Sequence, residues 1–270
     1  MGILVNYNRL VCMILFLPSL CYSNQTIASK ATFYETSDGK GGTCGYGNHG
    51  NYMNNMRVTA VSSKLYNNGA GCGACYHVTC KEKPVCVSWF NGTCSRVETI
   101  CSFSGTKLMV TDNREGPVGT DFIIPYTNFG SLAVHPGVAY YVYAKGVVDV
   151  NYRRVSCTNN NNGIINLALE VDEHTNYPAY IAFVPITYQG GLTDILAIEI
   201  YEEKCNKWIA MRRAYGAVFD MANPPSGPLK LRIQVTDHDG SITKWVQSKK
   251  TIIPSYWKPG TIIQTDIQLS

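Results

Sequence analysis

The sequence predicts an all-β protein of two domains. Apolar and polar residues alternate with a period of two in several short stretches, and no sustained helical period occurs before Cys157. The polar segment 158–163 separates two stretches that each have the length of a domain. With 45% hydrophobic and only 16% charged residues, both stretches contain enough apolar side chains to form a folded core.

The chain begins with a segment that reads as a secretory signal peptide, residues 1–23. Arg9 precedes an apolar run that ends at Pro18, and small residues follow. The run is too short to span a membrane, and the C-terminal residues have no apolar tail that would signal a lipid anchor. A secreted protein without a membrane partner is therefore expected.

Cysteines concentrate in the first domain. Loss of the signal peptide removes Cys12 and Cys21 from the 11 cysteines, so an odd number remains and at least one thiol lies outside intramolecular pairs. The spacing from Cys72 to Cys80, C-x2-C-x4-C, is compatible with zinc or with disulfides. The oxidising environment of a secreted chain favours disulfides, and no metal or cofactor is expected.

The charge distribution limits the partners. The net charge of +4 is mild and no Lys/Arg cluster is present, so nucleic acid is not expected as a partner. Two sequons, Asn24-Gln25-Thr26 and Asn91-Gly92-Thr93, make Asn24 and Asn91 candidate N-glycosylation sites.

The first domain, residues 24–157, is expected to contain short strands joined by loops. Alternation and turn signals predict strands near residues 31–34, 58–60, 76–78, 107–111 and 148–152, with a turn at 67–69. A glycine-rich loop leads from the first strand to Cys44. Residues 80–101 hold four cysteines and are expected to form a polar loop, and residues 126–133 a short helix.

The second domain, residues 164–270, alternates more regularly. Strands are expected at 167–171, 198–201 and 229–236, and a turn at 237–240 leads into a further strand at 242–246. Several short strands at regular spacing predict an antiparallel β-sandwich. Trp208 and Trp257 are assigned to its core.

Motifs spread over most of the chain resemble those of the expansins, plant proteins that loosen cell walls. The matching segments are Thr32-Phe33-Tyr34 and residues 42–47, 71–76, 110–112, 152–157, 214–219 and 253–258. The resemblance implies that the first domain is a six-stranded double-psi β-barrel related to family 45 glycoside hydrolases. It implies that the second domain is an immunoglobulin-like, carbohydrate-binding β-sandwich.

The same resemblance implies a set of disulfides. The expected pairs are Cys44 with Cys72, Cys75 with Cys157, and Cys80 with Cys101. Cys86 and Cys94 then remain for an additional bridge inside an insertion, and Cys205 has no assigned partner.

One departure from the family bears on chemistry. Glycoside hydrolysis needs two carboxyl groups, and expansins are known for keeping the acid in an HFD motif and lacking the base. Counted back from Phe129-Gly130, the acid position here is Ile123, which donates no proton. This loss resembles the expansin-like B subgroup. Asp112 and Asp121 remain candidate polar residues of the groove, each weighed against a structural role in a turn or cap.

The residues implied in polysaccharide binding are mostly aromatic. The resemblance places Tyr180 and Tyr215 at family binding positions, Tyr215 where the family has a Trp. Aromatic residues suit such positions because sugar rings stack their C–H faces on aromatic rings. Further positions in the first domain extend this surface: Thr32, Phe33, Tyr34 and Tyr46. The alternative for the aromatic residues is burial in the core or in a half-buried strand.

These observations predict a secreted, monomeric plant cell-wall protein that binds cellulose and matrix polysaccharides such as xyloglucan, xylan or pectin. It is expected to loosen the wall by disrupting noncovalent contacts between polymers, without hydrolysis. Two alternatives are a binding module without loosening activity and a weak β-glucan hydrolase that uses Asp112 and Asp121.

Overall fold

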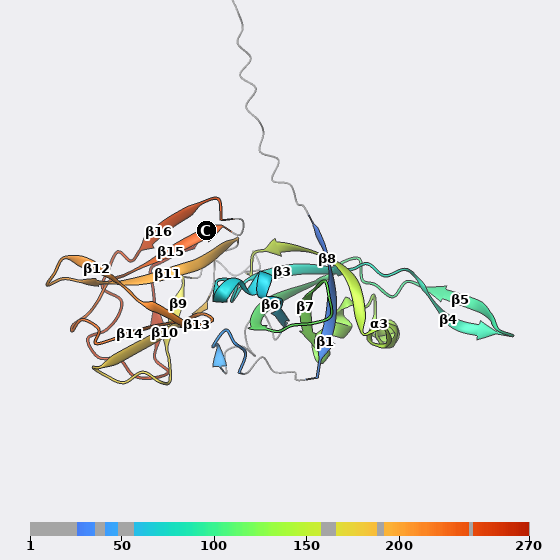
Figure 1. Cartoon of the computed structure of the whole chain (residues 1–270), viewed down its shortest axis with the longest axis horizontal. Helices are drawn as coiled ribbons and strands as arrows, with labels where there is room; N and C mark the ends of the chain where they lie inside the picture. The colour runs from blue at the N-terminus through green and yellow to red at the C-terminus, as the bar shows by residue number, and fades with distance from the viewer. Residues whose placement is uncertain are drawn as a thin grey trace, which may run out of the picture.

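The computed structural model describes residues 26–35, 41–47, 57–157, 166–187, 192–237 and 240–269. The predicted signal peptide, Asn24 and the predicted linker at 158–163 lie outside these residues. Two β-rich bodies lie side by side along the long axis of the molecule, and a hairpin projects from the far end of the first (Figure 1). No helix among these residues is long and apolar enough to cross a membrane.

The first body is a closed six-stranded barrel, which confirms the predicted fold of the first domain. Its strands, in order around the barrel, are β1 (Ile27–Tyr34), β7 (Thr120–Pro125), β2 (Val58–Val61), β6 (Thr106–Asn113), β3 (Cys75–Cys80) and β8 (Val147–Val155). Strands β1 and β7 are parallel, as are β2 and β6. Tyr76, Phe122 and Tyr152 stack edge to face inside the barrel.

Short helical segments connect the barrel strands. They are α1 (Ser63–Tyr66), η3 (Asn67–Gly69), α2 (Tyr126–Phe129), η4 (Gly130–Leu132), η5 (Pro136–Val138) and α3 (Ala139–Lys145). The predicted helix at 126–133 corresponds to α2 and η4. The sequence does not predict helix α1, because its four residues are too few to establish a helical period.

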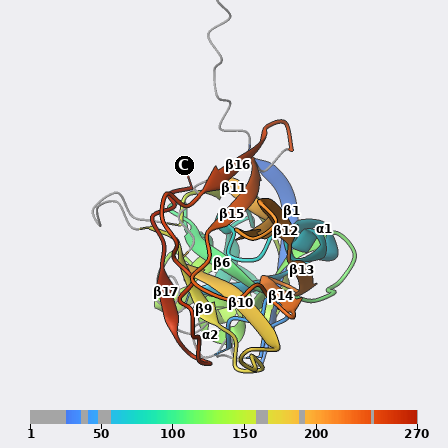
Figure 2. The same ribbon diagram turned by 90° about the vertical axis from the view of Figure 1, so that its left-hand side faces the viewer.

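The second body is the predicted antiparallel β-sandwich. One sheet has the order β13 (Arg212–Tyr215), β14 (Val218–Ala222), β10 (Tyr180–Thr187), β9 (Ala168–Val171), β17 (Ile262–Gln264). The other has the order β12 (Lys207–Ala210), β11 (Thr193–Glu202), β15 (Leu231–Asp237), β16 (Thr243–Gln247). The end-on view shows the two sheets as facing layers (Figure 2).

The core of the sandwich contains one of the two predicted tryptophans. Trp257 is 2% exposed and belongs to the same hydrophobic cluster as Phe183, Phe219 and Leu231. The assignment of Trp208 to the core is wrong. It is only half-buried, its ring lies 5.0 Å from that of Tyr201, and the guanidinium of Arg232 lies over it at 4.6 Å. A cation–π contact with Arg232 therefore stabilises the Trp208 ring in place of packing in the core.

The predicted polar loop at 80–101 is also wrong in part. Strands β4 (Val85–Phe90) and β5 (Thr93–Glu98) form a two-stranded sheet that extends away from the barrel (Figure 1). The turn residues Asn91 and Gly92 both have positive φ, as a tight hairpin turn requires.

All four expected disulfides are present. Cys44–Cys72, Cys75–Cys157 and Cys80–Cys101 lie within the barrel domain, and Cys86–Cys94 joins β4 to β5. Among the cysteines that the structure describes, Cys205 is free, and it is exposed in the turn between β11 and β12.

Candidate functional site

The two domains meet where the loop after β1 packs on the outer face of the five-stranded sheet. A single hydrophobic cluster contains barrel residues together with Ala182, Val184, Ala217 and Val218 of the sandwich. The amide of Ala217 donates a hydrogen bond of 3.0 Å to the carbonyl of Cys44. We call this contact the domain seam: the residues of loop 41–47, Gly69 and Arg154 on the barrel, and residues 182–184, 194–195 and 213–218 on the sandwich.

Glycines allow the backbones to approach closely at the seam. A Cβ on Gly216 would lie 2.2 Å from the carbonyl oxygen of Thr43, and one on Gly69 would lie 2.3 Å from the carbonyl oxygen of Gly216. A Cβ on Gly45 would lie 2.5 Å from the side chain of Val218. Gly45, Gly69 and Gly216 therefore allow the two domains to pack closely.

Two arginines add polar contacts across the seam. Arg213 donates to the carbonyls of Gly69, Gly216 and Ile195, and burial lowers the pKa of its guanidinium. Arg154, whose side chain is 4% exposed, donates to Oδ1 of Asp194 at 2.8 Å. The bonds from Arg213 to Gly69 and from Arg154 to Asp194 join the two domains and help to orient one on the other.

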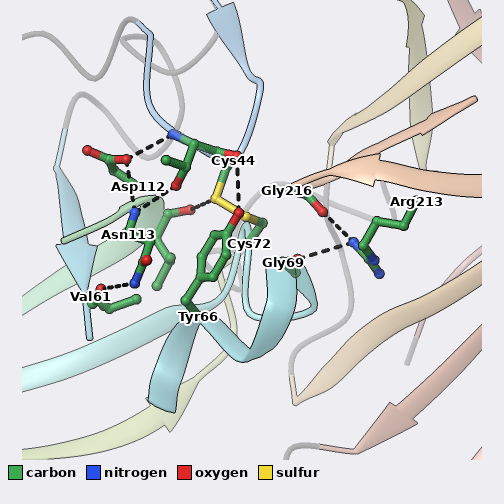
Figure 3. Close-up of a disulfide and its surroundings, with 11 residues drawn as sticks. Cys44, Val61, Tyr66, Gly69, Cys72, Asp112, Asn113, Arg213 and Gly216 are labelled. Atoms are coloured by element: carbon green, nitrogen blue, oxygen red, sulfur yellow. Dashed lines mark hydrogen bonds between the residues drawn. A yellow bond between two sulfur atoms is a disulfide. The ribbon is translucent and has the colours of Figure 1, made fainter. Parts of the chain in front are cut away.

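Asp112 attaches the loop 41–47 to the barrel (Figure 3). Its Oδ1 accepts from the amides of Thr43 (2.8 Å) and Asn113 (2.9 Å), and its Oδ2 accepts from Nε of Arg114 (2.8 Å). Asp112 as a whole is 7% exposed. The disulfide Cys44–Cys72 fixes the same loop from the other side.

The predicted acid position lies in the same row of the barrel as Asp112. Ile123 pairs with Thr32 on one side and with Ala60 on the other, and Ala60 pairs with Asp112. Residues paired across neighbouring strands point to the same face. The four side chains thus form a row across β1, β7, β2 and β6, in which Ile123 is 4% exposed.

Asp121 is on β7, two residues before Ile123, and its carboxylate is bound by hydroxyls. Oδ1 accepts from Ser62 and Oδ2 accepts from Ser29, both at 2.8 Å. Strand spacing and rise place the Cα atoms of Asp121 and Asp112 roughly 12 Å apart.

The remaining barrel positions differ in what they present. Thr32 donates its hydroxyl to the carbonyl of Gly146 at 2.8 Å, and the guanidinium of Arg114 lies 4.2 Å from the ring centre of Tyr34. Phe33 points away from this row and packs among aromatic rings: Tyr126, Phe129 and Tyr143.

Tyr46 does not extend an exposed binding surface. It is 4% exposed and belongs to the hydrophobic cluster that spans the seam. The prediction of a stacking ring at Tyr46 is therefore wrong, because the sandwich covers the loop that carries it. The domain contact that buries this residue brings together segments far apart in the sequence.

Tyr180 is held by a buried carboxylate on the outer face of the five-stranded sheet. Its hydroxyl donates to Oδ2 of Asp220 at 2.8 Å, and Arg212 donates to both oxygens of Asp220. Partial burial, followed by the neighbouring carboxylate, raises the pKa of Tyr180 to about 12. The two hydrogen bonds from Arg212 lower the pKa of Asp220. Tyr180 is therefore a neutral, oriented phenol.

Tyr215 stands beside a pocket between the domains. The pocket has a volume of about 580 Å³ and is lined by barrel residues 41, 42 and 45–47 and by Glu170, Asp172, Glu173, Val184 and Tyr215 of the sandwich. Tyr215 is 48% exposed. Burial of part of the ring, and then the charges of Asp172 and Glu173, raise its pKa. The site therefore combines an exposed ring with nearby carboxylates.

The acidic lining of this pocket was missed by sequence reasoning. Glu170, Asp172 and Glu173 lie at the end of β9, and alternation in that strand indicates only that Glu170 faces away from the sandwich core. Their position opposite loop 41–47 depends on the domain contact. Within the described ranges, no group of three or more His, Cys, Asp or Glu residues could hold a metal ion.

Comparison with known proteins identifies the family. A sequence model of the Expansin C-terminal domain matches residues 167–254. Expansin-like B1 of Arabidopsis thaliana is 40% identical over 263 residues, which cover 96% of each chain. The chain belongs to the expansin family. Expansin-like B1 of Oryza sativa subsp. japonica is 33% identical over 265 residues, 96% of this chain and 94% of the relative.

Solved expansin structures share the fold. The crystal structure of apo-Clavibacter michiganensis expansin superposes on this expansin with a TM-score of 0.60, 19% identity, and coverage of 91% of this chain and 98% of the other. A second structure, of a mutant of the same bacterial expansin in complex with cellohexaose, matches with a TM-score of 0.59 at 19% identity. The barrel and sandwich described above are thus the two domains of an expansin fold.

Proposed function

We propose that this expansin is secreted to the plant cell wall, binds cellulose or a matrix β-glucan, and loosens contacts between polymers without cleaving them. The binding surface in this proposal runs from the outer face of the five-stranded sheet across the seam to the loop 41–47. Two observations support secretion: the segment 1–23 resembles a signal peptide, and disulfides such as Cys44–Cys72 are typical of proteins outside the cytosol.

The exposed ring of Tyr215 beside the seam pocket is the observation that supports binding. Its 48% exposure leaves ring surface for a sugar, and the carboxylates of Asp172 and Glu173 can accept hydrogen bonds from sugar hydroxyls. The outer face also carries Tyr180, whose bond to Asp220 fixes its orientation. The complex of a bacterial expansin with cellohexaose supports a β-glucan as the ligand class.

Sheet geometry supports a polymer rather than a monosaccharide as ligand. Tyr215 pairs with Val218, and Tyr180 pairs with Ala222, so the two tyrosines lie two strands apart and four residues apart along the sheet. Strand spacing and rise then separate them by roughly 16 Å. One sugar ring cannot contact both, whereas successive residues of an extended glucan can.

The chemistry of the barrel row supports action without hydrolysis. The family acid position is the buried Ile123, and each oxygen of Asp112 and Asp121 already accepts a hydrogen bond within the barrel. Hydrolysis would need one of these carboxyl groups to donate a proton and another group to activate water. Noncovalent disruption needs only that binding free energy compete with polymer–polymer hydrogen bonds.

Binding is tested by co-sedimentation of the purified mature protein with insoluble cellulose and with xyloglucan-, xylan- or pectin-coated particles. We expect Tyr215→Ala to weaken binding by about five- to tenfold, as loss of one stacking contact of roughly 1 kcal/mol implies. Tyr140→Ala is the matched control, because Tyr140 is 72% exposed on α3 outside the proposed surface. Equal loss in both variants, or no loss in either, would contradict the proposed site.

A further inference from the structure

The tip of the β4–β5 hairpin combines a tight turn with a glycosylation sequon. Phe90 pairs with Thr93, and only Asn91 and Gly92 separate them. The two turn residues have φ values of 47° and 75°, which is the pattern of a type I′ turn. Phe90, Asn91, Gly92 and Thr93 are all exposed, so the Asn91 side chain is accessible to a modifying enzyme.

The turn also fixes which side chains lie next to each other. Residues paired directly across two antiparallel strands have Cβ atoms roughly 5 Å apart on one face of the sheet. Phe90 and Thr93 therefore share a face at the tip, next to Asn91. Trp89 precedes Phe90 in the same strand and faces the opposite side.

Phe90 is largely exposed to solvent. It is 71% exposed, at the end of a hairpin that projects into solvent (Figure 1). A phenylalanine ring in water costs free energy that a covering group would recover. The sequon places a covalently attached sugar at the adjacent residue, so that the hairpin can supply this covering group itself.

We propose that Asn91 carries an N-linked glycan whose first N-acetylglucosamine packs its C–H face on the ring of Phe90. In the attachment step, the amide nitrogen of Asn91 bonds to C1 of the first sugar of a polyprenyl-diphosphate-linked oligosaccharide. The bond from C1 to the diphosphate oxygen breaks, the diphosphate leaves with the electron pair, and the amide loses one proton. The role of Thr93 is to complete the acceptor sequon.

This packing would stabilise the hairpin where the rest of the fold does not support it. The disulfide Cys86–Cys94 ties the strands nearer the barrel, and Tyr141 donates to the carbonyl of Val87 near the base. Beyond this disulfide, residues 88–93 are all exposed. The stacked sugar adds a contact at the free end, and its polar edge covers an aromatic ring that would otherwise favour association between molecules.

The inference depends on secretion, which is part of the proposed function, but it is tested separately. The protein is produced with an Asn24→Gln substitution in secreting cells that add only oligomannose glycans, so one sequon remains. Three forms are compared: intact, trimmed with endoglycosidase H to the first N-acetylglucosamine, and freed of glycan with a peptide N-glycanase, which leaves Asp at position 91. Deuterium exchange is measured for backbone amides of residues 85–98.

We expect the intact and trimmed forms to exchange alike, and the sugar-free form to exchange about two- to tenfold faster at the tip, as an aromatic contact of this size implies. Thr93→Val, which keeps Asn91 but destroys the sequon, should behave like the sugar-free form. Phe90→Ala should abolish the difference between trimmed and sugar-free forms, whereas Trp89→Ala should preserve it.

Three results would overturn the inference. They are an unmodified Asn91 in the mass spectrum of the hairpin peptide, equal exchange in the trimmed and sugar-free forms, and an undiminished difference in Phe90→Ala. Cellulose co-sedimentation of the Thr93→Val protein measures the proposed function independently. Failure of that binding would leave the glycan result unchanged.

Discussion

Asp220 controls the state of the surface around Tyr180. It is 3% exposed, and it accepts hydrogen bonds from Arg212 and from the hydroxyl of Tyr180. Because these donors favour the ionised carboxylate, the pKa of Asp220 lies below its ordinary value of 3.8. The ionised form of the Asp220 side chain is therefore favoured more in the folded state than in the unfolded state.

This shift predicts a stability difference that depends on pH. A lowered folded-state pKa contributes stability that is fully present above the unfolded pKa and is lost as the pH falls through the folded pKa. We expect Asp220→Asn to be less stable than the parent protein at about pH 6, with the difference shrinking as the pH approaches about 2. Urea unfolding at both pH values measures it. The control Glu203→Gln alters an exposed acid and should leave the free energy of unfolding unchanged at both pH values. If the stability lost in Asp220→Asn did not depend on pH, this would contradict the lowered pKa of Asp220.

Tyr215 offers a gain-of-function prediction at the same scale. A tryptophan has a larger stacking face, and the 48% exposure of Tyr215 leaves room for it on the solvent side. We expect Tyr215→Trp to tighten cellulose binding about two- to fivefold, the factor that roughly 0.5–1 kcal/mol provides. A binding isotherm on insoluble cellulose tests this, with Trp245→Tyr on the opposite sheet as a control that leaves affinity unchanged. Weaker binding by Tyr215→Trp would contradict a stacking role.

Single residues also show where sequence reasoning reaches its limit. The row of Ile123 and Asp112 follows from strand pairing, whereas the assignment of Ile123 to the family acid position stays a prediction from the family resemblance. The burial of Tyr46 could not, because it depends on a contact between segments far apart in the sequence. The hydrogen bond from the Thr43 amide to Asp112 could not be predicted either, because it depends on where loop 41–47 lies against the barrel.

At the level of elements, the turn at Gly216 carries the domain contact. Its φ is +46°, which L-residues rarely adopt, and a Cβ there would lie 2.2 Å from the carbonyl oxygen of Thr43. Strain and overlap therefore act together at this position.

We expect Gly216→Ala to lower the free energy of unfolding by about 2–4 kcal/mol, the sum of an unfavourable φ and an overpacked contact. Gly260→Ala is the matched control, because Gly260 has φ +73° but open space around a built Cβ. Its cost should be only the φ strain of about 1 kcal/mol. Urea denaturation compares the two; equal costs would show that the seam tolerates a methyl group.

Elements also explain two errors of sequence-based prediction. The polar, cysteine-rich composition of residues 80–101 favours a loop, although Asn91-Gly92 is a strong turn signal for the β4–β5 hairpin. The assignment of Trp208 to the core rests on a strand-edge segment with no matching binding role, whereas the guanidinium of Arg232 lies over its half-buried ring. By contrast, the cleanly alternating strands β11 and β15 are predicted correctly.

At the scale of the whole molecule, the barrel and sandwich form one structural unit. A shared hydrophobic cluster, three glycines and two arginines connect them. A fixed seam would hold the rings of the sandwich and the loop of the barrel in one orientation toward a polymer. Binding free energy would then act on one extended surface.

Loss of Arg213 should weaken this unit. Its guanidinium donates to three carbonyls, one of them, that of Gly69, across the seam, so Arg213→Met removes these bonds and should cost about 2–4 kcal/mol. We expect the parent protein to unfold in a single calorimetric transition and the variant to unfold at lower temperature. Arg96→Met removes an exposed ion pair on the hairpin and should cost under about 0.5 kcal/mol. Two separate transitions in the parent protein would contradict a rigid seam.

Creep of isolated wall strips tests most directly whether this expansin loosens the wall without hydrolysis. Heat-inactivated strips under constant load are treated with the purified mature protein, and reducing sugars are measured in the same bath. We predict extension without release of reducing ends, and the same extension after Asp121→Asn, because both carboxylate oxygens of Asp121 accept hydrogen bonds from Ser29 and Ser62 within the barrel. Sugar release that disappears with Asp121→Asn would contradict the claim and indicate a hydrolase.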